Sequence, residues 1–106
     1  MKKYLIIMAS QVETSSCRTP DVTTLQHICK LSIVNDKPVM MDYWVNSVEK
    51  KVIIGVRDSG EKLLVKNEEE YTSPIGKVYK VKDDYIIETE NSLYIVDCSI
   101  ETKKIS

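Results

Sequence analysis

Several residue types that build specialised sites are scarce in this 106-residue chain. Glycine occurs only three times, at scattered positions, so no glycine-rich loop for a phosphate or dinucleotide is present. The single histidine, His27, lies two residues before Cys29. Positions two apart on a helix point to nearly opposite sides, so this pair cannot chelate a metal ion. We therefore expect no metal site and no cofactor.

Catalytic groupings are missing as well. Nucleophilic catalysis needs a nucleophile, a base within hydrogen-bond reach and a group that orients the base. One histidine inside a predicted helix does not supply that set. Carboxylates are plentiful, but nearly all fall in predicted turns, where solvated acids are expected. The sequence thus predicts a protein that is not an enzyme and has no catalytic residues.

Long apolar runs and paired cysteines are absent too. The apolar stretch near the N-terminus covers only residues 4–9 and is not followed by a cleavage pattern of small residues. No run approaches the roughly 18 apolar residues of a membrane-spanning helix. Three cysteines are an odd number, which favours reduced thiols. We expect a cytoplasmic protein that does not enter a membrane.

What the chain does contain is the composition of an ordinary globular domain. Apolar residues make up 42%, charged residues 29%, and the net charge is −1. This length supports one hydrophobic core, so residues 1–106 are predicted to form a single domain.

The first third of the chain predicts a strand, a loop and a helix. Residues 1–18 are expected to hold a short strand and a mobile loop. A helix is predicted over residues 19–35, because Thr19 can cap it, proline fits its first turn, and an acid follows. The stripe expected to pack on a sheet recurs at three- and four-residue steps: Val22, Leu25, Ile28, Cys29 and Ser32.

Residues 39–98 predict antiparallel strands. Residues 39–48 fit both a strand and a helix, and we take the strand, paired with residues 52–56. Gly60 closes a clear hairpin turn. From residue 61 to 98 the pattern predicts a meander, with apolar groups on both faces of its last strands, so the second face must be covered by the helix, by barrel closure or by another subunit. Residues 101–106 should fray.

The predicted fold class is therefore α+β. One amphipathic helix packs on a mainly antiparallel sheet, or on a partial barrel, of five to seven strands.

Candidate binding residues are an arginine and several polar or aromatic side chains. Arg57 ends a predicted strand beside a turn, where it can hold an anion in a forked contact or pair with Asp58 or Glu61. Tyr43 and Trp44 form an aromatic patch that is either core or a partner anchor. The full candidate set is Tyr43, Trp44, Arg57, Thr72, Ser73, Tyr85 and Tyr94.

Residues 70–75 and 85–94 carry a family resemblance. They resemble the C-terminal β-segment of small phage-encoded proteins, over roughly a third of the chain. The resemblance implies a viral or phage origin and action in the host cytoplasm. Some phage proteins, such as the anti-Thoeris proteins, sequester a host nucleotide signal, which offers an analogy.

Together these features predict a non-catalytic binding or interaction protein that self-associates and contacts a host protein. One alternative is a sponge that binds a small ligand or nucleotide in a pocket between subunits. A second alternative is a nucleic-acid-binding β-domain, in which lysines and tyrosines of the C-terminal sheet bind a strand. The net charge of −1 weighs against it.

Overall fold

The computed structural model describes residues 18–105, so the predicted N-terminal strand lies outside the described residues. Over these described residues the fold is α+β, as predicted, with two helices and seven strands in two sheets. The elements are α2 (Val22–Asn35), β1 (Val39–Met40), α3 (Trp44–Val48), β2 (Ile53–Val56), β3 (Lys62–Val65), β4 (Ile75–Val81), β5 (Asp84–Thr89), β6 (Leu93–Asp97) and β7 (Glu101–Lys104).

The larger sheet has the order β1-β6-β5-β4. Its antiparallel pairs β4–β5 and β5–β6 confirm the predicted meander from residue 75 onward. Lys82 adopts a left-handed φ of 56° in the turn between β4 and β5. β1 pairs in parallel with β6, an addition that the sequence pattern did not indicate.

The smaller sheet has the order β3-β2-β7. The predicted hairpin is confirmed: β2 and β3 are antiparallel, and Gly60 takes a φ of 95° in the turn. Two predictions were wrong here. The meander does not begin at residue 61, because β3 pairs with β2 instead of β4. Residues 101–104 do not fray, because β7 completes the free edge of β2 in parallel.

The predicted strand over residues 39–48 is also wrong. Only Val39–Met40 pairs as a strand, and Trp44–Val48 forms the short helix α3. Residues 52–56 therefore pair elsewhere. The helix is favoured because it buries Trp44 and Ser47 together, and the Ser47 hydroxyl accepts a hydrogen bond from the backbone N–H of Asp97 at 2.9 Å.

Helix α2 starts later and faces differently than predicted. Its N-cap is Asp21, whose carboxylate accepts from the N–H of Thr23, so Thr19 does not cap it. The residues that it buries are Thr24 and Ile28, whereas Val22, Leu25 and Cys29 of the predicted stripe are exposed. A buried hydrogen bond explains this orientation. The Thr24 hydroxyl donates to the buried carboxylate of Asp84 at 2.6 Å, so this side of the helix faces the sheet.

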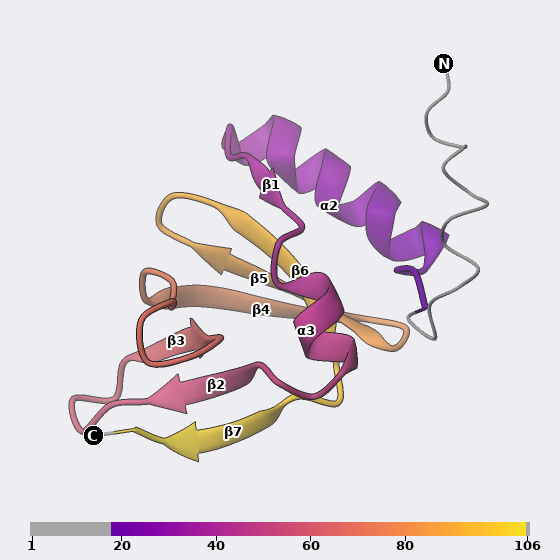
Figure 1. Ribbon diagram of the computed structural model, residues 1–106. Coiled ribbons are helices and arrows are strands. Elements are labelled where there is room, and N and C mark those ends of the chain that lie inside the picture. Colours follow the sequence, from indigo (N-terminus) through magenta and orange to yellow (C-terminus); the bar gives the residue numbers. More distant parts are fainter. Residues whose placement is uncertain (1–17, 106) are drawn as a thin grey trace.

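The core lies on both faces of the meander, in three layers that run from top to bottom in Figure 1: α2, the larger sheet and the smaller sheet. Ile28, Trp44, Ile86, Leu93 and Ile95 form the cluster on the helical side. The cluster towards the smaller sheet contains Tyr43, Val52, Ile54, Leu64, Ile87, Val96 and Ile100. Both apolar faces are thus covered within one chain, so they do not argue for a neighbouring subunit.

Among residues 18–105, no helix has the length and apolar character needed to cross a bilayer.

Candidate ligand-binding groove

The two aromatic residues that the sequence predicted to be either core or a partner anchor belong to the core. Tyr43 and Trp44 are each 5% exposed. The Tyr43 ring packs edge-on against Tyr94, with centroids 5.3 Å apart. The indole N–H of Trp44 donates to the backbone carbonyl of Arg18 at 2.8 Å. Of the two interpretations left open for this patch, the structure shows the core.

Of the polar candidates, Thr72 bonds the backbone, whereas the Ser73 hydroxyl accepts a hydrogen bond from the side-chain amide of Asn91 at 3.4 Å. The Thr72 hydroxyl is buried, accepts from the N–H of Leu64 at 3.1 Å and donates to the carbonyl of Ser73 at 2.8 Å. Tyr85 and Tyr94 pack against the cluster between the two sheets. None of these four residues lines the groove of this chain that contains Arg57.

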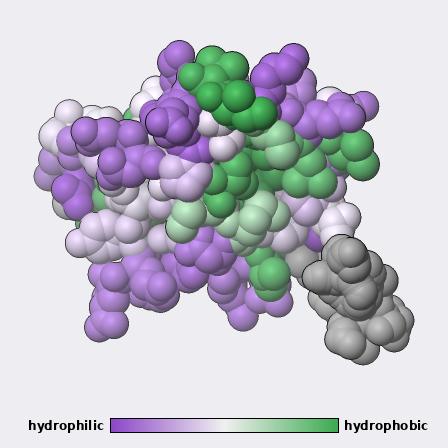
Figure 2. All heavy atoms as spheres, turned by 90° about the horizontal axis from the view of Figure 1, so that it is seen from above, coloured by the Kyte–Doolittle hydropathy of each residue, from purple (hydrophilic) through white to green (hydrophobic). Residues whose placement is uncertain are grey.

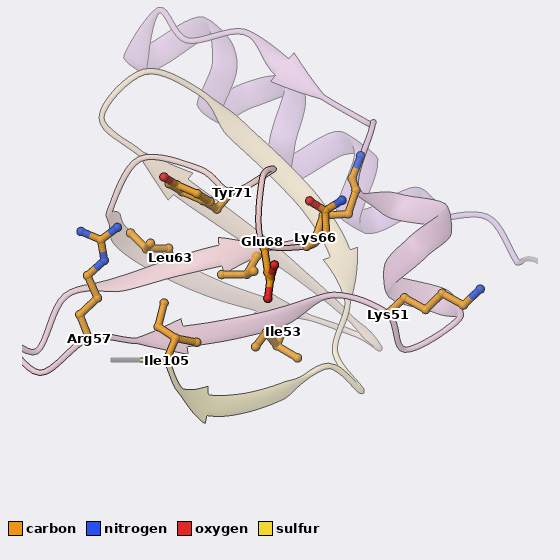
Figure 3. Close-up of a pocket in the computed structure, with 10 residues that line it drawn as sticks. Lys51, Ile53, Arg57, Leu63, Lys66, Glu68, Tyr71 and Ile105 are labelled. Atoms are coloured by element: carbon orange, nitrogen blue, oxygen red, sulfur yellow. The ribbon is translucent and has the colours of Figure 1, made fainter.

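Arg57 instead lines an open groove of about 780 Å³ over the smaller sheet, on the face away from the core (Figure 3). The lining residues come from three separate segments of the chain: Lys51, Ile53, Arg57, Leu63, Val65, Lys66, Asn67, Glu68, Tyr71 and Ile105.

The floor of the groove is apolar because side chains alternate along a strand. Ile54 pairs with Leu64, and both point into the core. Their neighbours Ile53, Leu63 and Val65 therefore point the other way and line the groove. A small two-faced sheet thus provides core on one side and a binding surface on the other.

Gly55 makes room for the fourth floor residue, Ile105. A Cβ atom added to Gly55 would lie 2.8 Å from Cδ1 of Ile105 and 3.0 Å from a methyl group of Val65. The backbone N–H of Ile105 donates to the carbonyl of Val56 at 2.9 Å, which continues the β2–β7 pairing beyond Lys104. Ile105 is consequently held flat against β2.

One wall of the groove is the turn that follows β3. The side-chain oxygen of Asn67 accepts from the N–H groups of Glu69 and Glu70 at 2.8 and 2.9 Å, which fixes the turn locally. An isolated bridge then pairs Val65 with Tyr71. The Tyr71 side chain is placed beside the floor in this way and remains 53% exposed.

The rim of the groove carries more positive than negative charge. The lining includes three cations, Lys51, Arg57 and Lys66, and one acid, Glu68. Figure 3 shows Arg57 and Lys51 towards opposite ends, with Glu68 over the floor between them. Lys66 is partly engaged, because its ammonium lies 4.6 Å from the centroid of the Tyr43 ring.

Arg57 is only loosely paired on this rim. Its Nη1 atom lies 3.8 Å from Oε1 of Glu61, which is beyond hydrogen-bond distance. Of the two partners that the sequence left open for Arg57, Asp58 and Glu61, the structure shows this loose contact with Glu61. An exposed ion pair of this length contributes little to stability, so a ligand anion can compete for the guanidinium.

Sequence reasoning missed most of the lining. In the sequence, Tyr71 is one of several tyrosines that could stack on a nucleic acid, and Lys51 and Ile105 have no predicted role. A local signal existed for Tyr71, since it follows the acidic turn directly. No local signal existed for Ile105, because its place depends on the pairing of β7 with β2.

The residues that line the groove include no histidine, cysteine, serine or threonine, so a serine–histidine or cysteine–histidine pair is absent there. Over residues 18–105, no group of three or more His, Cys, Asp or Glu side chains is arranged to hold a metal ion.

Comparison with known proteins finds no family model, no curated protein and no solved structure that matches the chain.

Proposed function

We propose that this protein is a non-catalytic binding protein, and that the groove holds a small ligand with an apolar body and one anionic group. The observation that carries the proposal is an apolar floor next to an available guanidinium. Burying the ligand body against Ile53 and Ile105 removes apolar surface from water. Arg57 offers a planar fork that suits a carboxylate or a phosphate.

The size of the groove supports a small molecule. Its volume of about 780 Å³ lies within the range of roughly 300–1,000 Å³ that is typical of small-molecule sites. The half-exposed ring of Tyr71 adds a surface on which a flat ligand can stack. An aromatic or short acyl compound with one acidic group fits this description.

The sponge alternative fits this proposal, with the groove as its binding site. Sequestration of a host signal during phage infection remains the setting that we propose, but within one chain instead of between subunits. The nucleic-acid alternative has less support. Stacking needs exposed rings, whereas Tyr85 and Tyr94 pack on the core and the Tyr79 hydroxyl donates to Glu88 at 3.3 Å.

Ligand titration followed by amide chemical shifts tests the proposal. The probes are 1-naphthyl phosphate, 1-naphthoate and uncharged 1-naphthol. We expect saturable shifts at Ile53, Leu63, Val65 and Ile105 with the two anions and weaker binding of the neutral probe. No saturable shift at the floor with any probe would refute the proposal.

Two variants test the assigned contacts. Arg57→Gln removes one charge-assisted hydrogen bond, so it should weaken the binding of the two anionic probes by about 10- to 100-fold. The affinity for naphthol should stay unchanged. Tyr71→Ala should weaken the binding of all three probes. Lys62→Gln is the matched control, because Lys62 lies on β3 but does not line the groove, so its loss should not change affinity.

A further inference from the structure

The outer surface of α2 is unusually poor in charge. Charged residues make up 29% of the chain, yet Lys30 is the only one among the 14 residues of this helix. The exposed apolar side chains include Ile33, which is 82% exposed, and Val22, which is 66% exposed. Solvent-facing helices normally carry charged residues on that face, and depletion of charge marks the centre of protein interfaces.

Four of the exposed residues form one stripe. Val22, Leu25, Cys29 and Ile33 follow each other at steps of three, four and four residues. At about 100° per residue they fall within an arc of about 80°. All four are exposed, although Leu25 is only 36% exposed. Figure 2 shows hydrophobic side chains gathered on the face where α2 lies uppermost in Figure 1.

We infer that this stripe is a self-association surface on which α2 of a second copy packs antiparallel. The stripe matches itself in that arrangement. A two-fold axis near the middle of the helix places Val22 against Ile33 of the other copy at both ends, with Leu25 and Cys29 between them. Lys30 lies outside the stripe, where its charge stays in water.

The size of the stripe sets the strength of the contact. A helix of 14 residues is about 21 Å long. One stripe of that length buries less than the roughly 800 Å² per partner of a standard interface. The dimer should therefore dissociate in the micromolar range or above, not persist at nanomolar concentration.

Sedimentation velocity of the full chain from about 10 to about 500 µM tests the inference. We expect the weight-average mass to rise from monomer towards dimer. Ile33→Lys should raise the dissociation constant at least about ten-fold. Val34→Lys is the matched control: Val34 is 72% exposed but points about 100° away from Ile33, so the dimer should persist.

A cross-link reports the orientation. In a C17S/C98S background, Cys29 is the only thiol, and the antiparallel arrangement offsets the two copies by only about 5 Å along the axes. A bismaleimide with an ethylene spacer should join them, and Ile33→Lys should suppress the product. A monomer at every concentration, which includes the case in which residues 1–17 cover the stripe, would overturn the inference. Equal effects of Ile33→Lys and Val34→Lys on the dissociation constant would overturn the inference as well.

Discussion

The Nη2 atom of Arg18 lies 2.5 Å from Oδ1 of Asp84, whose side chain is completely buried. The other carboxylate oxygen accepts from the Thr24 hydroxyl at 2.6 Å and from the backbone N–H of Asp21 at 2.9 Å. One carboxylate therefore ties the start of α2 to the turn between β4 and β5.

Replacing this carboxylate should destabilise the fold. Asp84→Asn removes the charge that three donors share, and an amide cannot accept from all of them with the same geometry. We expect the free energy of unfolding to fall by about 2–3 kcal/mol, since hydrogen bonds to charged groups are worth more than neutral ones. Urea unfolding followed by Trp44 fluorescence measures the change.

The neighbouring acid provides the control for that substitution. Asp83 is exposed, and it is its backbone carbonyl that accepts hydrogen bonds from the Arg18 guanidinium and the N–H of Cys98. Asp83→Asn should therefore leave the free energy of unfolding within about 0.5 kcal/mol of the wild type. Equal losses from the two substitutions would mean that the buried ion pair has no special role.

Acid should weaken the fold through two carboxylates. Burial opposes the charge on Asp84, but hydrogen bonds from Thr24, Asp21 and Arg18 outweigh it and hold its pKa below the usual 3.8. A hydrogen bond from Lys37, only partly offset by burial, likewise lowers the pKa of Glu88 below 4.5. Both contributions are complete above these ordinary values and are lost as the pH falls through the lower folded pKa values.

Unfolding experiments between about pH 6 and about pH 2.5 test this expectation. The free energy of unfolding should decline below about pH 4.5 in the wild type. It should decline less steeply in Asp84→Asn/Glu88→Gln. A slope that the double substitution leaves unchanged would assign the acid sensitivity to other carboxylates.

At alkaline pH, the phenol of Tyr43 should ionise later than that of an ordinary tyrosine. Burial, with smaller contributions from Tyr94 and Asp42, raises the pKa of Tyr43 from 10.0 to about 12. Its contribution to stability is complete below pH 10 and is lost as the pH rises through about 12, because only the unfolded chain ionises easily there. Absorbance titration of the phenolates should show this late transition, and Tyr43→Phe should remove it while Tyr71→Phe should not.

Gly55 should tolerate no larger residue. Gly55→Val places methyl groups where Ile105 and Val65 already lie, and overpacking of this kind costs about 1–3 kcal/mol. It should also lift Ile105 from the floor and weaken the naphthyl probes. Gly76→Val is the control, because the nearest atom to a Cβ there is a backbone oxygen at an ordinary 3.6 Å. Unfolding and probe titration on both variants provide the comparison.

The parts of the fold that sequence predicted are those with strong local signals. Tight-turn residues between β-branched runs indicate the meander, and Gly60 indicates the hairpin. Residues 39–48 fit two periods equally, so local pattern could not decide between them. Tertiary contacts decided it, through the burial of Trp44 and the hydrogen bond between Ser47 and Asp97.

The candidate site was harder to predict because it is built from distant segments. Arg57 was found because it stands beside a turn. All four residues of β7 are exposed and charged or polar, which is typical of a frayed end, and only the open edge of β2 makes them a strand. Without that pairing, no pattern places Ile105 beside Ile53.

The parallel pairing of β2 with β7 also bears on the order of folding. Ile53 pairs with Glu101, so the whole meander must be traversed before this ladder can close, and such distant contacts form late. The meander and the hairpin, by contrast, join neighbours in sequence. We expect the backbone amide hydrogens of β7 to exchange with solvent through local opening reactions of lower free energy than those that expose the amides of β5. The groove would then open and close repeatedly while the rest of the fold stays intact.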